Sequence, residues 1–250
     1  MFGWFEKRLD PFPSSTPVVP PARLLPFMWH YVRPAAPWLL LLGLMSMGIA
    51  VAEVMMYQFL GNIVDWLSSA NKETFLQEEG WHLVAMGAIV LVALPLMGSI
   101  HTMTMHQTLA GNFGMIARWH MHRFLLRHSM TFFANEFAGR VSTKVMQTAL
   151  SIREVALKII DVFVYAISFV GSMLFMVAAA DWRLALPLVA WLAIYIVILT
   201  YFVPKLGRLA SEQADARSMM TGRIVDSYTN IATIKLFSHA GREEIYAREG

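Results

Sequence analysis

Residues 162–204 read VFVYAISFVGSMLFMVAAADWRLALPLVAWLAIYIVILTYFVP, and this stretch decides the fold class. It contains two apolar segments, residues 162–180 and 184–204, separated only by Asp181-Trp182-Arg183. About 20 consecutive apolar residues suffice for a helix to cross a bilayer. The stretch therefore predicts two membrane-spanning helices joined by a very short polar turn.

Two further apolar segments lie upstream, at residues 35–67 and 81–110. The first carries only Glu53 and Asp65 as charged residues, and the second has no Lys, Arg, Asp or Glu. Neither segment alternates polar and apolar residues as a membrane β-barrel strand does. The predicted fold class is therefore an all-α integral membrane protein with four spans.

The composition of the 250 residues agrees with a membrane location. Hydrophobic residues make up 57% and charged residues 15%, with a mean hydropathy of +0.52, whereas soluble domains average about 25% charged residues. The net charge of +3 comes from basic residues placed between the apolar segments, which argues against nucleic-acid binding. Cys is absent, so thiolate metal sites are excluded, and no metal site is predicted.

The basic residues also predict the orientation of the chain. All but Lys72 and Arg183 of the 20 Lys and Arg residues lie before the first span, between the second and third, or after the fourth. Basic residues accumulate on the cytoplasmic side of membrane proteins. We therefore expect a multi-pass protein with a cytoplasmic N-terminus.

The segments outside the membrane differ in character. Residues 1–26 contain six of the eleven prolines, so a disordered cytoplasmic tail is expected there. Residues 27–34 are aromatic with a basic end, which predicts a short interfacial helix. Amphipathic periodicity at residues 111–161 and 205–250 predicts that the spanning helices continue far into the cytoplasm.

The long cytoplasmic segment must reverse direction near residues 131–144. Asn135 is a candidate cap and Gly139 a candidate stop for a very short helix between them. Phe132, Phe133 and Phe137 place aromatic side chains at this tip. They either form a surface for a partner or pack the hairpin against its neighbours.

Polar residues recur at helical spacing inside the first two spans. They either line a translocation cavity or hold the helices together by hydrogen bonds. The candidate cavity residues are Ser46, Glu53, Tyr57, Ser99, Thr102 and His106.

Three groups of residues resemble a known family. Phe132-Phe133, Asn135, Gly139-Arg140 and Thr143-Lys144-Val145 are similar to the first intracellular loop of type I ATP-binding cassette (ABC) exporters. Asp181-Trp182-Arg183-Leu184 resembles the start of their fourth helix, and Asn230-Ile-Ala-Thr-Ile-Lys-Leu-Phe237 resembles a stretch of their fifth. The resemblance implies the N-terminal part of a six-helix transmembrane domain, with four spans and the start of a fifth.

The resemblance also implies two cytoplasmic coupling helices, at about residues 134–142 and 211–220. These would contact nucleotide-binding domains. Residues 212–217 also suit an ordinary solvated helical face. The first site is Phe133, Asn135, Glu136, Phe137, Gly139 and Arg140, and the second is Glu212, Gln213, Asp215 and Arg217.

The function implied by the resemblance is ATP-driven export. The substrate would be amphipathic or hydrophobic (a drug, lipid or peptide), moved by a homo- or heterodimer in a bacterial inner membrane. No Lys follows a Gly in this sequence, so ATP and Mg²⁺ are expected on a nucleotide-binding domain outside these residues. No catalytic or cofactor-binding residue is predicted within them. The alternative is a four-span anchor or regulatory module whose cytoplasmic hairpins bind a soluble partner without transport.

Overall fold

The computed structural model describes residues 2–14, 18–69, 75–135 and 138–236, together with residues 241, 245 and 248. Every regular element within these parts is a helix, which confirms the all-α prediction. Four of the helices are long and apolar enough to cross a membrane, as expected. The chain divides into two compact units, Met1–Asp181 and Trp182–Gly250.

The first crossing begins with a short helix. α2 (Leu24–Val32) passes through the 3₁₀ turn η1 (Arg33–Ala35) into α3 (Ala36–Ser69). Pro34 is tolerated because the first turn of a helix does not need its missing N–H. At ~1.5 Å per residue α3 extends roughly 50 Å, well beyond a hydrocarbon core of ~30 Å. α2 covers most of the segment expected to be interfacial.

The second crossing is a series of α-helical pieces joined by π-helical turns. Because a π turn holds an extra residue, each one rotates the face that the following helix presents. Pro95, which cannot donate a backbone hydrogen bond, follows the first π turn directly. After α4 (Phe75–Glu78), the pieces are α5 (Gly80–Ala88), η2 (Ile89–Ala93), α6 (Leu94–Met103), η3 (Thr104–Leu109) and α7 (Asn112–Leu125).

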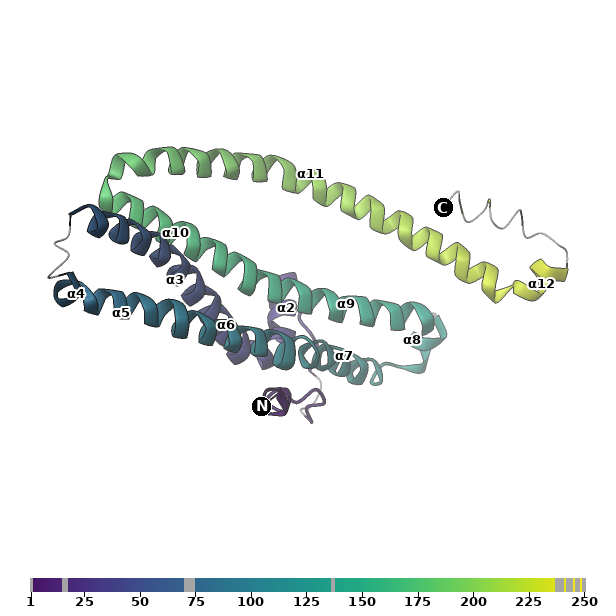
Figure 1. Ribbon diagram of the computed structural model, residues 1–250. Helices are drawn as coiled ribbons and strands as arrows, with labels where there is room; N and C mark the ends of the chain where they lie inside the picture. Colours follow the sequence, from purple (N-terminus) through teal and green to yellow (C-terminus); the bar gives the residue numbers. More distant parts are fainter. Residues whose placement is uncertain are drawn as a thin grey trace. The chain divides into compact units, whose positions relative to one another are not determined.

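The third crossing begins at the reversal that follows α7. The short α8 (Met130–Asn135) precedes α9 (Ala138–Lys158), the π-helical turn η4 (Ile159–Phe163) and α10 (Val164–Ala180). α3 packs against both α6 and α10, and farther along α7 packs against α9 (Figure 1). The buried apolar core lies where α2 and the start of α3 meet α7 and α9, and its members include Tyr31, Leu39, Leu42, Phe113, Ile116 and Ile152.

The tail prediction is wrong for the part of the tail at residues 2–14. Phe2–Glu6 form the helix α1, and Leu9 is buried in the core. Thr108 and Asn112 donate hydrogen bonds to tail carbonyl oxygens. Those carbonyls belong to Phe5 and Glu6 at the end of α1, where the last carbonyls of a helix have no i+4 partner and accept hydrogen bonds from other elements.

The cytoplasmic reversal differs in position from the expected one. The short helix is α8, which begins after Ser129 and ends at Asn135, whereas residues 134–142 were expected. The Ser129 hydroxyl accepts a hydrogen bond from the Phe132 N–H, as a helix cap does. Gly139 does not stop a helix but lies in the first turn of α9. Glycine ends a helix only where the chain adopts a left-handed conformation, and no sequence rule requires that here.

The second unit is dominated by one continuous helix. Only Asp181, in an extended conformation, separates α10 from α11 (Trp182–Thr229). α11 runs through Pro187, Pro204 and all of residues 211–220 before a turn at Asn230 leads into α12 (Ile231–Leu236). The separate coupling helix expected at about residues 211–220 is therefore wrong. These ten residues contain neither Pro nor Gly, so nothing in their sequence stops a helix.

Candidate functional site

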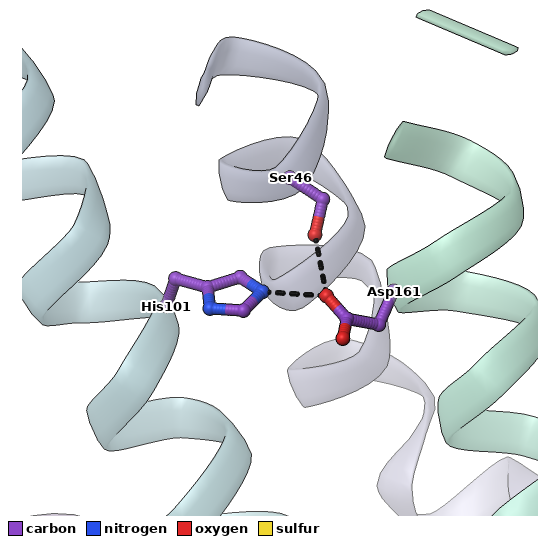
Figure 2. Close-up of polar contacts among 3 residues, drawn as sticks. All are labelled: Ser46, His101 and Asp161. Carbon is purple, nitrogen blue, oxygen red and sulfur yellow. Dashed lines mark hydrogen bonds and ion pairs between the residues drawn. The ribbon is translucent and has the colours of Figure 1, made fainter. Parts of the chain in front are cut away.

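A polar cluster joins the first three crossings near one end of their apolar segments. Asp161 lies in η4, His101 in α6 and Ser46 in α3. One carboxylate oxygen of Asp161 lies 2.7 Å from His101 Nε2 and accepts a hydrogen bond of 3.2 Å from Ser46 Oγ (Figure 2). Three elements distant in sequence therefore converge on a single oxygen atom.

The cluster is largely shielded from its surroundings. Ser46 is 2% exposed, and the side chains of His101 and Asp161 are 21% and 30% exposed. A carboxylate within a membrane segment is costly unless it is paired or reaches water. The imidazole, when protonated, supplies the countercharge, and the hydroxyl satisfies a second lone pair of the same oxygen.

Asp161 and His101 lie at similar depths in their crossings. Each lies about 20 residues from the far end of its crossing, at Ala180 and Gly80, which is roughly 30 Å at ~1.5 Å per residue.

Residue types alone would suggest a hydrolase, because Ser, His and Asp form a catalytic triad in many enzymes. In a triad the histidine lies between the serine and the carboxylate and accepts the hydroxyl proton. Here Ser46 and His101 both bind the carboxylate of Asp161 (Figure 2). The arrangement ties helices together and does not activate a nucleophile.

A second polar contact follows along the same helices. Tyr165 Oη in α10 donates a hydrogen bond to the Glu53 carboxylate in α3. Ser46 and Glu53 are seven residues apart and Asp161 and Tyr165 are four apart, so each pair lies on one helical face. The two contacts therefore form successive polar layers between the first and third crossings.

Two of the candidate cavity residues, Ser46 and Glu53, are thus brought into contact with the third crossing. The other four are exposed on their helices: Tyr57, Ser99, Thr102 and His106. Ser99 donates its hydroxyl to the Pro95 carbonyl in its own helix. In the second crossing the helical spacing thus selected exposed residues.

His101, Asp161 and Tyr165 were not among the predicted site residues. Asp161 immediately precedes an apolar segment, so it was assigned to the cytoplasmic extension. His101 lies two residues from Ser99 and five from His106, and therefore on another face of the helix. The sequence did offer one signal. Asp161 lies at one end of the third apolar segment, and His101 lies toward the same end of the second.

An open cavity of about 440 Å³ lies between α3 and α10, beside the level of Glu53 on α3. Its walls are mostly apolar, with Gln58 and Ser172 as polar members. The other lining residues are Val51, Val54, Met55, Gly171, Phe175, Met176 and Ala179. An apolar cavity with few polar groups suits a hydrophobic ligand or lipid chain.

The expected coupling residues fall on several elements. Phe133 in α8 is 38% exposed, and its ring packs edge-on against Phe132 at 5.2 Å. Asn135 ends α8, and Gly139 and Arg140 belong to α9, whereas Glu136 and Phe137 lie outside the described residues. The second set lies on an exposed face of α11: Glu212, Gln213, Asp215 and Arg217.

Comparison with known proteins agrees with this architecture. The family described as ABC transporter transmembrane region matches residues 39–246. A relative in Haemophilus influenzae, described as an uncharacterized ABC transporter ATP-binding protein, is 43% identical over 249 residues. The match covers 99% of this chain and 40% of the relative, so the chain spans less than half of that protein's length. With four membrane-spanning helices and a family match over most of its length, this multi-pass membrane protein belongs to the ABC transporter transmembrane-region family.

Proposed function

We propose that the chain forms the membrane-spanning part of an ATP-driven exporter. Its substrate is amphipathic or hydrophobic, and it works as a dimer in a bacterial inner membrane with its N-terminus in the cytoplasm. The family match over residues 39–246 carries this proposal. The apolar cavity between α3 and α10 supports the substrate class.

The length of the helices supports a mechanical role. α9 extends 21 residues before η4, which is about 31 Å of helix. It packs along α7, so the two helices form a stiff projection that ends at α8 (Figure 1). Such a projection transmits movement at its tip to the spans, as alternating access requires.

The energy source in this proposal is ATP with Mg²⁺, bound by a nucleotide-binding domain outside these residues. The name of the Haemophilus relative, an ATP-binding protein of which this chain covers 40%, supports that assignment. α8 is the first contact with this domain. α12 replaces residues 211–220 as the second, because the long helix first breaks at Asn230.

Loss of coupling at α8 tests the proposal. Phe133→Ala in the full-length protein, reconstituted in vesicles, should reduce substrate-stimulated ATP hydrolysis about tenfold by removing an exposed tip contact. Membrane insertion should not change. Met146→Ala provides the control, because Met146 is also an exposed apolar residue but lies on α9 away from the tip. Equal effects of the two substitutions would contradict coupling through α8.

A second comparison tests the revised position of the other contact. Leu236 in α12 is 78% exposed, and Leu236→Ala should uncouple hydrolysis from transport. Glu212→Ala and Asp215→Ala, on the solvated face of α11, should change transport less than twofold. The opposite ranking would favour residues 211–220. The four-span anchor is not favoured by the family match, and it predicts partner binding without any ATP-dependent substrate movement.

A further inference from the structure

The N-terminal tail is fastened to the cytoplasmic end of the second crossing. Thr108 Oγ1 donates to the Phe5 carbonyl at 3.1 Å, and Asn112 Nδ2 donates to the Glu6 carbonyl at 2.7 Å. Farther along, Trp119 Nε1 and Arg123 donate to the Pro13 carbonyl at 3.2 and 3.1 Å. Side chains of η3 and α7 thus bind the backbone of residues 2–14 near both ends of that segment.

These contacts give the tail a direction relative to the membrane. From Thr108 to Trp119 the second crossing advances by about 16 Å at ~1.5 Å per residue. α1 therefore lies at the membrane end of the tail. Residues 13 and 14 lie deeper in the cytoplasm.

Two independent contacts place α1 at the depth of the lipid headgroups. Thr108 lies roughly 40 Å from the outer end of its crossing at Gly80, which is close to the full thickness of a bilayer with its headgroups. Trp4 lies 6.5 Å, ring to ring, from Trp38 at the beginning of α3. α1 is therefore held against the border where both crossings enter the cytoplasm.

The surface at this depth is both aromatic and basic. Trp4 is 53% exposed, and the Arg8 guanidinium lies 3.8 Å from its ring. α2 adds the exposed side chains of Leu24, Leu25 and Trp29. Four exposed basic residues, Lys7, Arg8, Arg23 and Arg33, outnumber the two exposed acidic residues, Glu6 and Asp10.

We propose that α1 and α2 form a binding surface for anionic lipid headgroups, and that residues 2–14 clasp the second crossing to the cytoplasmic leaflet. Aromatic rings and Lys or Arg side chains are the groups that prefer the headgroup layer. The basic excess complements an anionic leaflet. The surface lies at the depth of the lipid headgroups. This proposal depends on membrane insertion and is independent of transport.

A spin label at residue 3 tests the depth. The 250 residues contain no Cys, so Gly3→Cys supplies a single thiol within them. A Cβ at Gly3 meets no atom within 4 Å, so the substitution leaves the fold intact. Ser14→Cys, near the other end of the tail, is the matched control. Both variants of the full-length protein are reconstituted in phosphatidylcholine vesicles with increasing phosphatidylglycerol.

The expected result is a difference between the two labels. The label at residue 3 should be reached by oxygen dissolved in the lipid and protected from a water-soluble nickel complex, with the reverse at residue 14. Phosphatidylglycerol should increase the protection at residue 3. Equal exposure of both labels to the nickel complex would overturn the proposal. Protection of residue 3 from both reagents would also overturn it, because protein would then cover the surface.

A charge substitution tests recognition of the headgroup. The measured quantity is the phosphatidylglycerol fraction at which the protection of residue 3 reaches half of its full change. Lys7→Gln should raise this fraction about fivefold, because one basic residue near an anionic surface contributes about that factor in affinity. Lys235→Gln, which removes the same charge from α12, is the control and should leave the fraction unchanged. Equal responses of the two variants would refute the role of headgroup charge.

Discussion

His101 and Asp161 are 60 residues apart in sequence, yet the imidazole Nε2 and a carboxylate oxygen are separated by 2.7 Å. The contact joins α6 to the π-helical turn η4, and Ser46 adds α3 to the same oxygen (Figure 2). Few buried apolar residues lie in the membrane half of this unit. Lipid removes the hydrophobic drive for helix association, so interhelical polar contacts contribute to holding the first three crossings together.

Replacing the carboxylate should weaken this contact. Asp161→Asn removes the charge that pairs with His101, and we expect the free energy of unfolding to fall by about 1–3 kcal/mol, less than for a fully buried pair. Titration with sodium dodecyl sulfate in mixed micelles measures the change. Exchange of the two residues, His101→Asp with Asp161→His, should recover part of the loss. No recovery would mean that the pair does not act as a unit.

The contact between Tyr165 and Glu53 should contribute separately. Tyr165→Phe removes the hydroxyl donor and leaves the carboxylate without that hydrogen bond, so we expect a loss of about 1 kcal/mol in the same titration. Tyr201→Phe is the matched control, because Tyr201 is 65% exposed on α11. A similar loss in both variants would contradict a specific role for the contact.

α3 and α6 approach each other closely at Gly48. A Cβ there would lie 2.8 Å from Met97 Sδ, so the flexible end of the methionine must move. Gly48→Ala should therefore cost about 1 kcal/mol or less of unfolding free energy. Gly61→Ala in the same helix meets no atom within 4 Å and should be neutral or slightly stabilising. Combining Gly48→Ala with Met97→Ala should relieve the clash; if it does not, the close approach is not its cause.

Arg153 stabilises the junction between η3 and α7. Its guanidinium donates to the Ala110 carbonyl at 2.9 Å, where the helix of the second crossing is interrupted. Arg153→Ala should cost about 1–3 kcal/mol, because a carbonyl loses a charged donor. Lys158→Ala, at an exposed position of the same helix, should change the unfolding free energy by less than about 0.5 kcal/mol. Equal losses of unfolding free energy in the two variants would contradict a specific role for the contact between Arg153 and the Ala110 carbonyl.

The sequence predicted the four spans because hydropathy is a local property. A backbone in lipid must satisfy its own hydrogen bonds, so a long apolar segment that crosses the membrane folds as a helix. The ends of the helices that extend beyond the apolar segments were harder to predict. Residues 211–220 were expected to form a separate short helix, yet they extend α11 because no residue there stops a helix.

What the sequence determined by itself is thus the helical class, the number of spans and the family to which their motifs belong. The tertiary structure decided which polar residues meet. The π-helical turns η2, η3 and η4 change the rotation of each crossing, so periodicity could not place His101 opposite Asp161. The tertiary structure also decided that the tail packs against the second crossing, because the donors that bind the Pro13 carbonyl lie 106 and 110 residues away in sequence. Composition records local preference, whereas these contacts depend on how distant helices pack.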